Sequence, residues 1–206
     1  MLKRCLTGVA AVILVLVLIS WPMRWMVTGQ VVDAETGKPI ENAVTTIKWL
    51  ESGPGPPGLA GTATTEEAED VSDSRGRFKL PIYASLLGVQ EFRMTVYKNG
   101  YICWSSDHIF PKYYIWSGNE QIFNSMKRRT DFIPKDGMII RMEPLKEYHS
   151  KEMHAVFTTR IGALVGTRIF YNAIKEEMEL SAEWAMKNRE KQRENTPGPA
   201  PSHPSL

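Results

Sequence analysis

Val27-Thr-Gly-Gln-Val-Val-Asp33-Ala-Glu-Thr-Gly37-Lys-Pro39-Ile-Glu-Asn-Ala-Val44 is the stretch of the sequence that decides the fold. Apolar positions lie on both sides of a polar cluster that runs from Asp33 to Gly37. Gly37 can take a positive φ without steric cost, and Pro39 restricts the backbone where the chain leaves the turn. The stretch therefore predicts two strands joined by a turn, which form the first unit of a β domain.

The length, charge and cysteine content of the chain limit its organisation. The chain has 206 residues, and without its apolar amino terminus and its polar tail it can form one core of roughly 100–150 residues. The net charge of +2 does not imply long-range attraction to nucleic acid, so no nucleic-acid partner is expected. Cys5 and Cys103 lie on opposite sides of the apolar segment, so they indicate neither a disulfide framework nor a metal-binding pair.

The amino terminus has the features of a membrane anchor. Lys3 and Arg4 precede an uncharged run, Leu6–Met23, that is rich in Val, Leu and Ile. Its length of roughly 18 residues meets the minimum for a spanning helix and exceeds the apolar region of a cleaved signal peptide, which is about 7–15 residues. We expect an uncleaved transmembrane helix over residues 1–25, with a cleaved signal peptide or a buried core helix as alternatives. Because Lys3 and Arg4 stay inside, the β domain of this single-pass protein is expected on the periplasmic side of the cytoplasmic membrane.

Alternating apolar residues predict further strands after the first turn. Ser52–Gly58 is rich in glycine and proline and cannot pair in a sheet, and the polar, acidic run Thr62–Asp70 is expected to continue that loop. The stretch Asp73-Ser-Arg-Gly76 predicts a turn, and the Asn99-Gly100 pair is a strong hairpin signal. The predicted strands are Met26–Asp33, Ala43–Trp49, Arg77–Tyr83, Phe92–Tyr97 and Tyr101–Phe110.

Several short motifs carry a resemblance to a known family. In chain order they are Gly29-Gln-Val-Val-Asp33, Thr36-Gly-Lys-Pro-Ile40, Asn42-Ala-Val44, Asp73-Ser-Arg-Gly-Arg-Phe78, Gly100-Tyr101 and Met138-Ile-Ile-Arg-Met-Glu-Pro-Leu145. Residues 27–145 thereby resemble the carboxypeptidase regulatory-like family of transthyretin-like domains. The resemblance implies a mostly β fold, an antiparallel immunoglobulin-like or transthyretin-like β-sandwich over residues 26–146, with an insertion at residues 111–136. It also implies a module that is mostly non-catalytic. Some transthyretin-like proteins are hydrolases, but their Tyr-Arg-Gly-Ser motif has no match here.

The insertion at residues 111–136 holds the candidate ligand-binding residues. Ser117-Gly-Asn-Glu120 has the spacing of a capping box and predicts a short helix. The basic run 127–129 falls at the carboxyl end of that helix, where the helix dipole favours positive charge. Aromatic rings beside these cations could hold a sugar ring, an anionic glycan or lipid headgroups, whereas the alternative is that they close an open sheet edge beside solvated charges. The candidate residues are Tyr113, Tyr114, Trp116, Lys127, Arg128 and Arg129.

The carboxyl-terminal region has the period of a helix. Ser150 can cap it, and apolar residues recur at spacings of three and four with no proline before Pro197. We expect a long helix within residues 147–195, followed by a disordered, proline-rich tail at 196–206. Gly162 and Gly166 predict close packing against the sheet or another helix. The charge-laced part after Lys175 is either solvent-exposed or binds a protein partner.

No catalytic constellation is found in the sequence. His149 and His154 are five residues apart, which does not place both on one helical face as a metal pair requires, so no metal or cofactor is expected. Cys103 lies in a predicted strand and is interpreted as a buried thiol. The sequence therefore predicts a non-catalytic, membrane-anchored scaffold or protein-interaction module of an envelope assembly. The alternative is a carbohydrate-binding module that uses the aromatics of the insertion.

Overall fold

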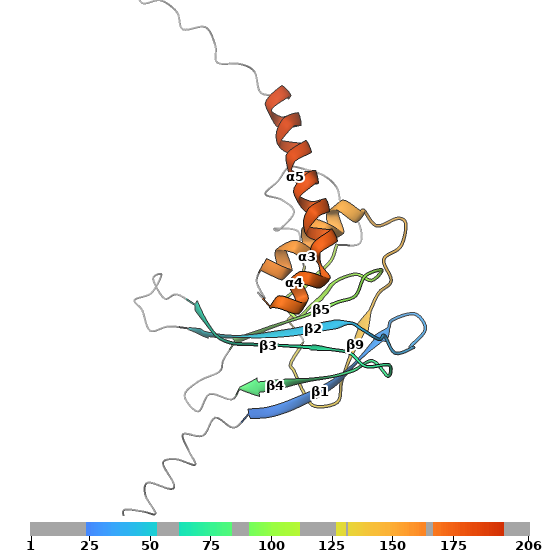
Figure 1. The fold of residues 1–206 in the computed structure, drawn as a ribbon, viewed down its shortest axis with the longest axis vertical. Coiled ribbons are helices and arrows are strands. Elements are labelled where there is room, and N and C mark those ends of the chain that lie inside the picture. The colour runs from blue at the N-terminus through green and yellow to red at the C-terminus, as the bar shows by residue number, and fades with distance from the viewer. Residues whose placement is uncertain are drawn as a thin grey trace, which may run out of the picture.

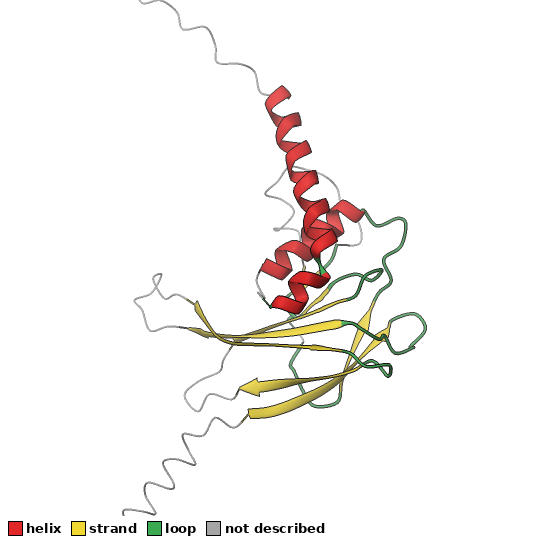
Figure 2. Ribbon diagram, viewed as in Figure 1, coloured by secondary structure: helices red, strands yellow, loops and turns green. Residues whose placement is uncertain are grey.

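The computed structural model describes residues 24–52, 62–83, 91–111, 127–130, 132–163 and 167–195. Two β-sheets pack face to face, and helices cover the outer face of one of them (Figure 1, Figure 2). The three-stranded sheet has the order β4-β1-β9, the four-stranded sheet has the order β3-β2-β5-β6, and β7 pairs with β8 in a separate ribbon. The strands are β1 (Arg24–Asp33), β2 (Val44–Ser52), β3 (Thr62–Val71), β4 (Arg77–Tyr83), β5 (Glu91–Tyr97), β6 (Trp104–Ser105), β7 (His108–Ile109), β8 (Lys127–Arg128) and β9 (Met138–Met142).

The domain is mostly β with a helical carboxyl terminus, as predicted, but its sheets are not antiparallel throughout. β1 pairs with β4 in antiparallel orientation and with β9 in parallel orientation. Parallel neighbours require a long crossover connection. Here that connection contains all strands of the four-stranded sheet, because β1 is the first and β9 the last of the strands in the described residues.

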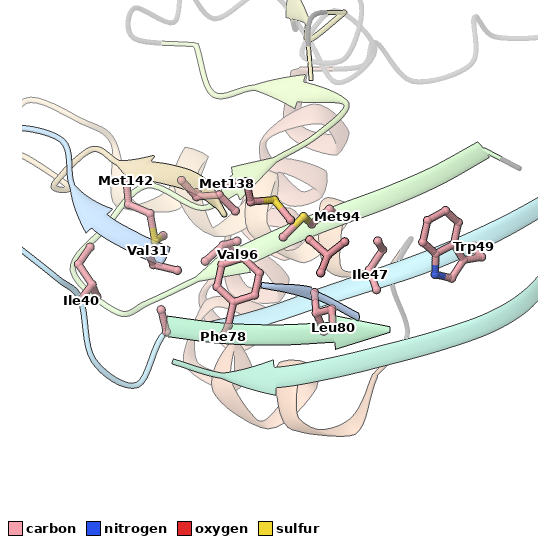
Figure 3. Packing of buried hydrophobic residues seen from close by; sticks show 13 residues of the cluster. Val31, Ile40, Ile47, Trp49, Phe78, Leu80, Met94, Val96, Met138 and Met142 are labelled. Carbon is pink, nitrogen blue, oxygen red and sulfur yellow. The ribbon is translucent and has the colours of Figure 1, made fainter. Parts of the chain in front are cut away.

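Alternating residues of both sheets form the core of the sandwich (Figure 3). Met94, Val96 and Met142 have no exposed surface, and the inward side of β4 contributes Phe78 and Leu80. Gly29 leaves room for the ring of Phe78, its register partner on the neighbouring strand of the same sheet, since a Cβ atom at this position would be 2.2 Å from that ring. The core members are Val27, Val31, Ile40, Ala43, Ile47, Trp49, Phe78, Leu80, Met94, Val96, Met138, Ile140 and Met142.

β3 corrects the prediction that Thr62–Asp70 is part of a loop. The whole run pairs with β2, in antiparallel register from Val44↔Val71 to Ser52↔Thr62. The acidic side chains of β3 lie outside the core, and two of them bind groups of neighbouring elements. Glu67 forms an ion pair with Lys48 on the neighbouring strand at 3.2 Å. The Glu69 carboxylate accepts hydrogen bonds from backbone amides at the start of a helix. The acidic composition of the run favoured a loop. The structure forms a strand instead, because these two carboxylates find partners in other elements.

The outer edge of β4 is closed by two carboxylates, Asp73 of the preceding turn and Asp70 of β3. Asp73 Oδ1 accepts from the backbone amide of Arg77 at 2.8 Å, and Asp70 Oδ2 accepts from the amide of Lys79 at 2.7 Å. Two residues further on, Pro81 has no amide hydrogen. An incoming strand would need these donors, so the edge is protected against strand addition.

The carboxyl-terminal region folds into three helices, which corrects the expectation of one continuous helix. They are α3 (Lys151–Ala163), α4 (Arg168–Ala173) and α5 (Lys175–Asn195). Ser150 caps α3 as predicted, since its Oγ accepts from the amide of Met153 at 3.2 Å. The helix does not continue because Thr167 has extended backbone angles and α5 returns along α3. This return lets apolar residues of all three helices bury against the four-stranded sheet.

A second apolar cluster joins the helices to that sheet. Val44 and Tyr97 lie on its outer face, and Phe157, Phe170 and Ile174 of the helices cover them. Gly162 of α3 contacts α4 and the residue that follows it, because a Cβ atom there would be 2.7 Å from Ile174 Cδ1 and 2.9 Å from Phe170 Cε1. The close packing predicted for Gly162 is therefore confirmed, whereas Gly166 lies outside the described residues.

Two predictions at the ends of strands need adjustment. The expected strand Tyr101–Phe110 is present as the short β6 and β7 with a bend between them, because Ser106 turns its amide to the carbonyl of Met94 at 2.8 Å. The predicted anchor lies outside the described residues, except that Arg24 and Trp25 already belong to β1. Among the described helices, none is long and apolar enough to cross a membrane.

Candidate functional site

The predicted ligand-binding residues are only partly placed. Tyr113, Tyr114 and Trp116 lie outside the described residues, as does the capping box that precedes the basic run. Lys127 and Arg128 are exposed in β8 and pair with β7, so they belong to a strand, while the helix predicted before them lies outside the described residues. Backbone pairing to His108 and Ile109 determines their position, which local helix signals could not reveal.

Arg129 is integrated into the edge of the four-stranded sheet. Its Nε donates to the carbonyl of Ser105 at 3.0 Å, and its amide donates to the carbonyl of Asp107 at 2.8 Å. The guanidinium lies 5.0 Å from the centroid of the Trp104 ring, whose other contact is an edge-on approach by Phe132 at 4.8 Å. Arg129 thus covers both an open backbone carbonyl and an aromatic face, as in the alternative in which these residues close a sheet edge.

A small cavity lies beside Arg129 and Trp104. Its volume is about 70 Å³, which matches roughly two water molecules at about 30 Å³ each. A sugar ring does not fit into this space. His108 also lines it, and burial lowers the pKa of its imidazole, so this side chain is neutral at neutral pH. The described part of the predicted site therefore has the properties of an edge closure, and a glycan site stays a prediction that depends on Tyr113, Tyr114 and Trp116.

A buried polar network under the helices was missed at the sequence level. His154 of α3 is 1% exposed and its Nδ1 lies 3.1 Å from Oε1 of Glu177 on α5. Its Nε2 accepts from the backbone amide of Cys103 at 3.0 Å. An acceptor nitrogen carries no hydrogen, so the neutral ring carries its proton on Nδ1 and donates it to Glu177. His154 therefore connects both helices to the sheet.

Tyr97 and Cys103 complete the surroundings of this network. The Tyr97 hydroxyl donates to Glu177 Oε1 at 3.3 Å, and burial together with the nearby Glu177 carboxylate raises the pKa of Tyr97. Burial likewise raises the pKa of the Cys103 thiol, which stays protonated. A thiol, an imidazole and a carboxylate are the components of a nucleophilic triad. Here the imidazole nitrogen nearest to Cys103 is occupied by a backbone amide, so the group holds helices in place and does not activate the thiol.

The sequence contained a weak signal for this network. His154 interrupts an otherwise apolar helical stripe that includes Met153 and Phe157, and such a histidine needs a buried partner. Nothing in the sequence singles out Glu177 among the four glutamates of its run. Within the described residues, no three side chains of His, Cys, Asp or Glu are grouped as they would be around a metal ion.

The opposite face of the sandwich carries an open groove that the sequence did not predict. Its volume is about 650 Å³. It lies over β1, β4 and the start of β9, on the side of the sandwich away from the helices (Figure 1). Polar, basic and apolar residues line it together. They include Thr28, Gln30, Arg75, Arg77, Lys79 and Ile139.

Comparisons with known proteins add little to this description. No protein-family model and no curated protein matches the chain. A streptococcal ancillary pilin is similar with 13% sequence identity and a TM-score of 0.29, over 61% of this chain and 30% of the pilin chain. A 9R-lipoxygenase from Cyanothece is similar with 16% identity and a TM-score of 0.28, over 56% of this chain and 16% of the lipoxygenase chain. This chain spans less than a third of either protein, and likeness at this level carries no argument about fold or function.

Proposed function

We propose that this protein is a non-catalytic interaction module, anchored in the cytoplasmic membrane through the apolar segment that precedes β1, with its helical layer as the contact surface for a protein partner. The observation that supports this most is the extent of α5 beyond the sandwich (Figure 1, Figure 2). A module of this kind needs an exposed element on the side of the domain away from the strand that follows its anchor. α5 extends on that side (Figure 1).

The dimensions of the helices indicate how much of α5 is supported. α5 has 21 residues and α3 has 13, which correspond to roughly 30 Å and roughly 20 Å of helix. One stripe of α5 is half-buried on the inner side, namely Glu177, Ser181, Trp184 and Asn188. The other sides are exposed, and Met186 has 58% of its surface in contact with solvent. An isolated helix of this length is marginally stable in water, so a partner would stabilise the outer turns.

The charges of α5 do not themselves require a partner. Acidic residues at 176–183 lie near its amino end, and basic residues at 187–193 lie near its carboxyl end. This order is favourable for the helix dipole. It is therefore the exposed apolar side chains of the helical layer that favour a contact surface. These are Ile169 at 39%, Met178 at 37% and Met186 at 58% exposure.

We further propose that the sandwich is of the carboxypeptidase regulatory-like type. The motifs that carry the resemblance meet at one corner of the domain, where Asp33 Oδ1 accepts from the amides of Glu35 and Thr36 at 2.9 and 2.7 Å. Tyr101 donates to the other oxygen of Asp33. Gly76 has a φ of +71°, and a Cβ atom there would be 2.4 Å from the carbonyl of Val31. These are requirements of folding, so the resemblance supports a fold type and not a catalytic site.

Protease protection tests the anchor and its orientation. A tag after Leu206 should be degraded once the outer barrier of the cell is opened while the cytoplasmic membrane stays intact. A tag that is protected until the cytoplasmic membrane is lysed would place the β domain in the cytoplasm and refute the proposed orientation.

Photo-crosslinking tests the contact surface. A photoreactive amino acid at Met186 should form a product with one defined membrane or envelope protein, and the substitution Met178→Glu should reduce its yield. The same amino acid at Glu66, which is exposed on β3, serves as the control. Equal products from both positions would show that α5 is not a specific contact surface.

A further inference from the structure

We infer that the outer face of the three-stranded sheet rests on an anionic lipid surface, with the groove over β1 and β4 in contact with the headgroups. This inference depends on the proposed membrane anchor and extends it, because it assigns the face of the domain that meets the bilayer. Three features support it: the residues that line the groove, the hydrogen bonds and ion pairs of their charged side chains, and the position where β1 begins.

The pairing registers bring one row of side chains across this face. Gln30 of β1 lies between Arg77 of β4 and Ile139 of β9. Two residues before Gln30 on the same strand, Thr28 lies opposite Lys79. These positions alternate with the buried core residues of the same strands, so they belong to the outer side of the sheet. No helix of the described chain covers this side (Figure 1).

The carboxylates at the groove are used within the protein. Asp70 bonds to the amides of Val71 and Lys79. Asp73 pairs with the Arg77 guanidinium at 3.0 Å. Asp136 accepts from the amide and the hydroxyl of Thr28 at 3.0 and 2.6 Å. The oxygens of these carboxylates are therefore engaged by local donors, and Asp73 is in addition paired with a cation.

Two cations at the groove have no such partner. Within the described residues, neither the guanidinium of Arg75 nor the ammonium group of Lys79 makes a hydrogen bond or an ion pair, and both side chains are exposed. The lining holds three cations, Arg75, Arg77 and Lys79, against two carboxylates, Asp70 and Asp73, so it carries one positive charge in excess. The phosphates of lipid headgroups are anionic, and each basic residue near an anionic bilayer contributes about fivefold in partitioning.

Exposed apolar side chains accompany these cations. Met26 has 44% and Ile139 has 54% of its surface exposed, on strands that are neighbours in the sheet. Basic and apolar side chains on one surface are typical of elements that lie at the boundary between headgroups and acyl chains. An acidic protein ligand would explain the cations but not the exposed Met26 next to the anchor.

The start of β1 identifies the membrane as the occupant. The apolar run ends at Met23, and β1 begins at Arg24, so no linker separates the proposed anchor from the sheet. A domain joined in this way stays within a few residues of the bilayer surface. β1 belongs to the sheet on the side away from the helices (Figure 1). The point where the proposed anchor joins the domain is therefore on this sheet and not on the helical layer, which favours this side of the sandwich as the one that meets the headgroups.

Energy transfer from the full chain in vesicles tests this orientation. The chain carries Cys5→Ser and a fluorophore at Ser74→Cys, in the exposed turn beside Arg75, while Cys103 is buried and does not compete for the label. Acceptors are attached to lipid headgroups in vesicles of phosphatidylcholine with or without phosphatidylglycerol. A second preparation carries the label at Met186→Cys on α5. We expect efficient transfer from position 74 in vesicles with phosphatidylglycerol, and at least twofold less from position 186.

Charge reversal provides the matched comparison. Arg75→Glu with Lys79→Glu should reduce transfer from position 74 at least twofold, and high salt should have the same effect on the unsubstituted chain. Lys127→Glu with Arg128→Glu makes the same change of charge at exposed β8 and should leave the transfer unchanged. Circular dichroism confirms that each variant is folded.

Two results would overturn the inference in distinguishable ways. If alkaline carbonate leaves the chain in the vesicles but position 74 transfers no more than position 186, the anchor stands and the assigned face is wrong. If alkaline carbonate releases the chain, the anchor itself is refuted, and the docking surface with it. Equal loss of transfer in both charge-reversal variants would show that the attraction is not specific to the groove.

Discussion

The Tyr101 hydroxyl donates a hydrogen bond to Oδ2 of Asp33 across 3.0 Å, and so connects the chain after β5 to the turn that follows β1. These two residues are 68 positions apart in the sequence. The other oxygen of Asp33 accepts from the amides of its own turn. One carboxylate thus organises a local turn and joins the two sheets.

Loss of the Tyr101 hydroxyl should destabilise the domain. Tyr101→Phe removes a hydrogen bond to a carboxylate and should lower the free energy of unfolding by about 1–2 kcal/mol. Chemical denaturation of the full chain measures this change. Tyr171→Phe, on the exposed side of α4, is the control and should have no measurable effect. Equal stability of both variants would show that the bond to Asp33 contributes nothing.

Asp33 should also make stability depend on pH in the acid range. The backbone amide of Thr36, and then the Tyr101 hydroxyl, hold the pKa of Asp33 below its ordinary value of 3.8. A lowered pKa in the folded state contributes stability above the ordinary value, and that contribution is lost as the pH falls through the lowered pKa. Asp33→Asn should therefore be less stable near neutral pH and should lose less on acidification to about pH 3. Parallel unfolding curves of both proteins at all pH values would contradict this.

The carboxylate of Glu177 should be more important than that of its neighbour. Glu177 is 14% exposed and accepts from His154 and Tyr97, whereas Glu176 is exposed. Glu177→Ala leaves two buried donors without an acceptor and should cost about 2–3 kcal/mol. Glu176→Ala is the matched control and should change stability by less than about 0.5 kcal/mol. Hydrogen exchange should report the loss in α3 and α5 first, and uniform exchange across the sandwich would argue against a helix-docking role.

Gly162→Ala should destabilise the protein although alanine favours helices. The gain in helix propensity is about 1 kcal/mol, but the new methyl group would lie 2.7 Å from Ile174 Cδ1 and 2.9 Å from Phe170 Cε1. Neither neighbour has exposed surface into which it could move. We expect a net loss of about 1–2 kcal/mol. Ile174→Val removes the nearest contacting atom and should partly compensate in the double variant, so additive losses would refute this explanation.

Substitutions of Arg129 and Arg128 distinguish a role in closing the sheet edge from a role in a basic, ligand-binding run. Arg129→Ala removes the bond to the carbonyl of Ser105 and the contact with Trp104 and should cost about 1–2 kcal/mol. Arg128→Ala removes an exposed side chain and should have no measurable effect. Tryptophan fluorescence should change in the first variant only. Equal effects would indicate that the two residues act together on a ligand.

Local sequence signals were sufficient where neighbours in the chain make the structure. Gly37, Gly76 and Gly100 take the positive φ angles that their turns require, and Ser150 caps α3. Alternating apolar residues identified β1, β2, β4 and β5, whereas β9 was expected from the family resemblance. These features depend on backbone conformation and on a period of two, both of which are written in consecutive residues.

The sequence alone determined that this chain contains a β domain with a buried alternating core, a helical carboxyl terminus and an apolar segment before the first strand. Only the tertiary structure decided that acidic β3 is a strand, that the helical region folds back on itself, and that Arg129 closes a sheet edge. It also brought His154 to Glu177 and placed Arg75 and Lys79 on one groove. In each case the stabilising partner is distant in the sequence, and burial or hydrogen bonding to a distant group overrides what a residue favours locally.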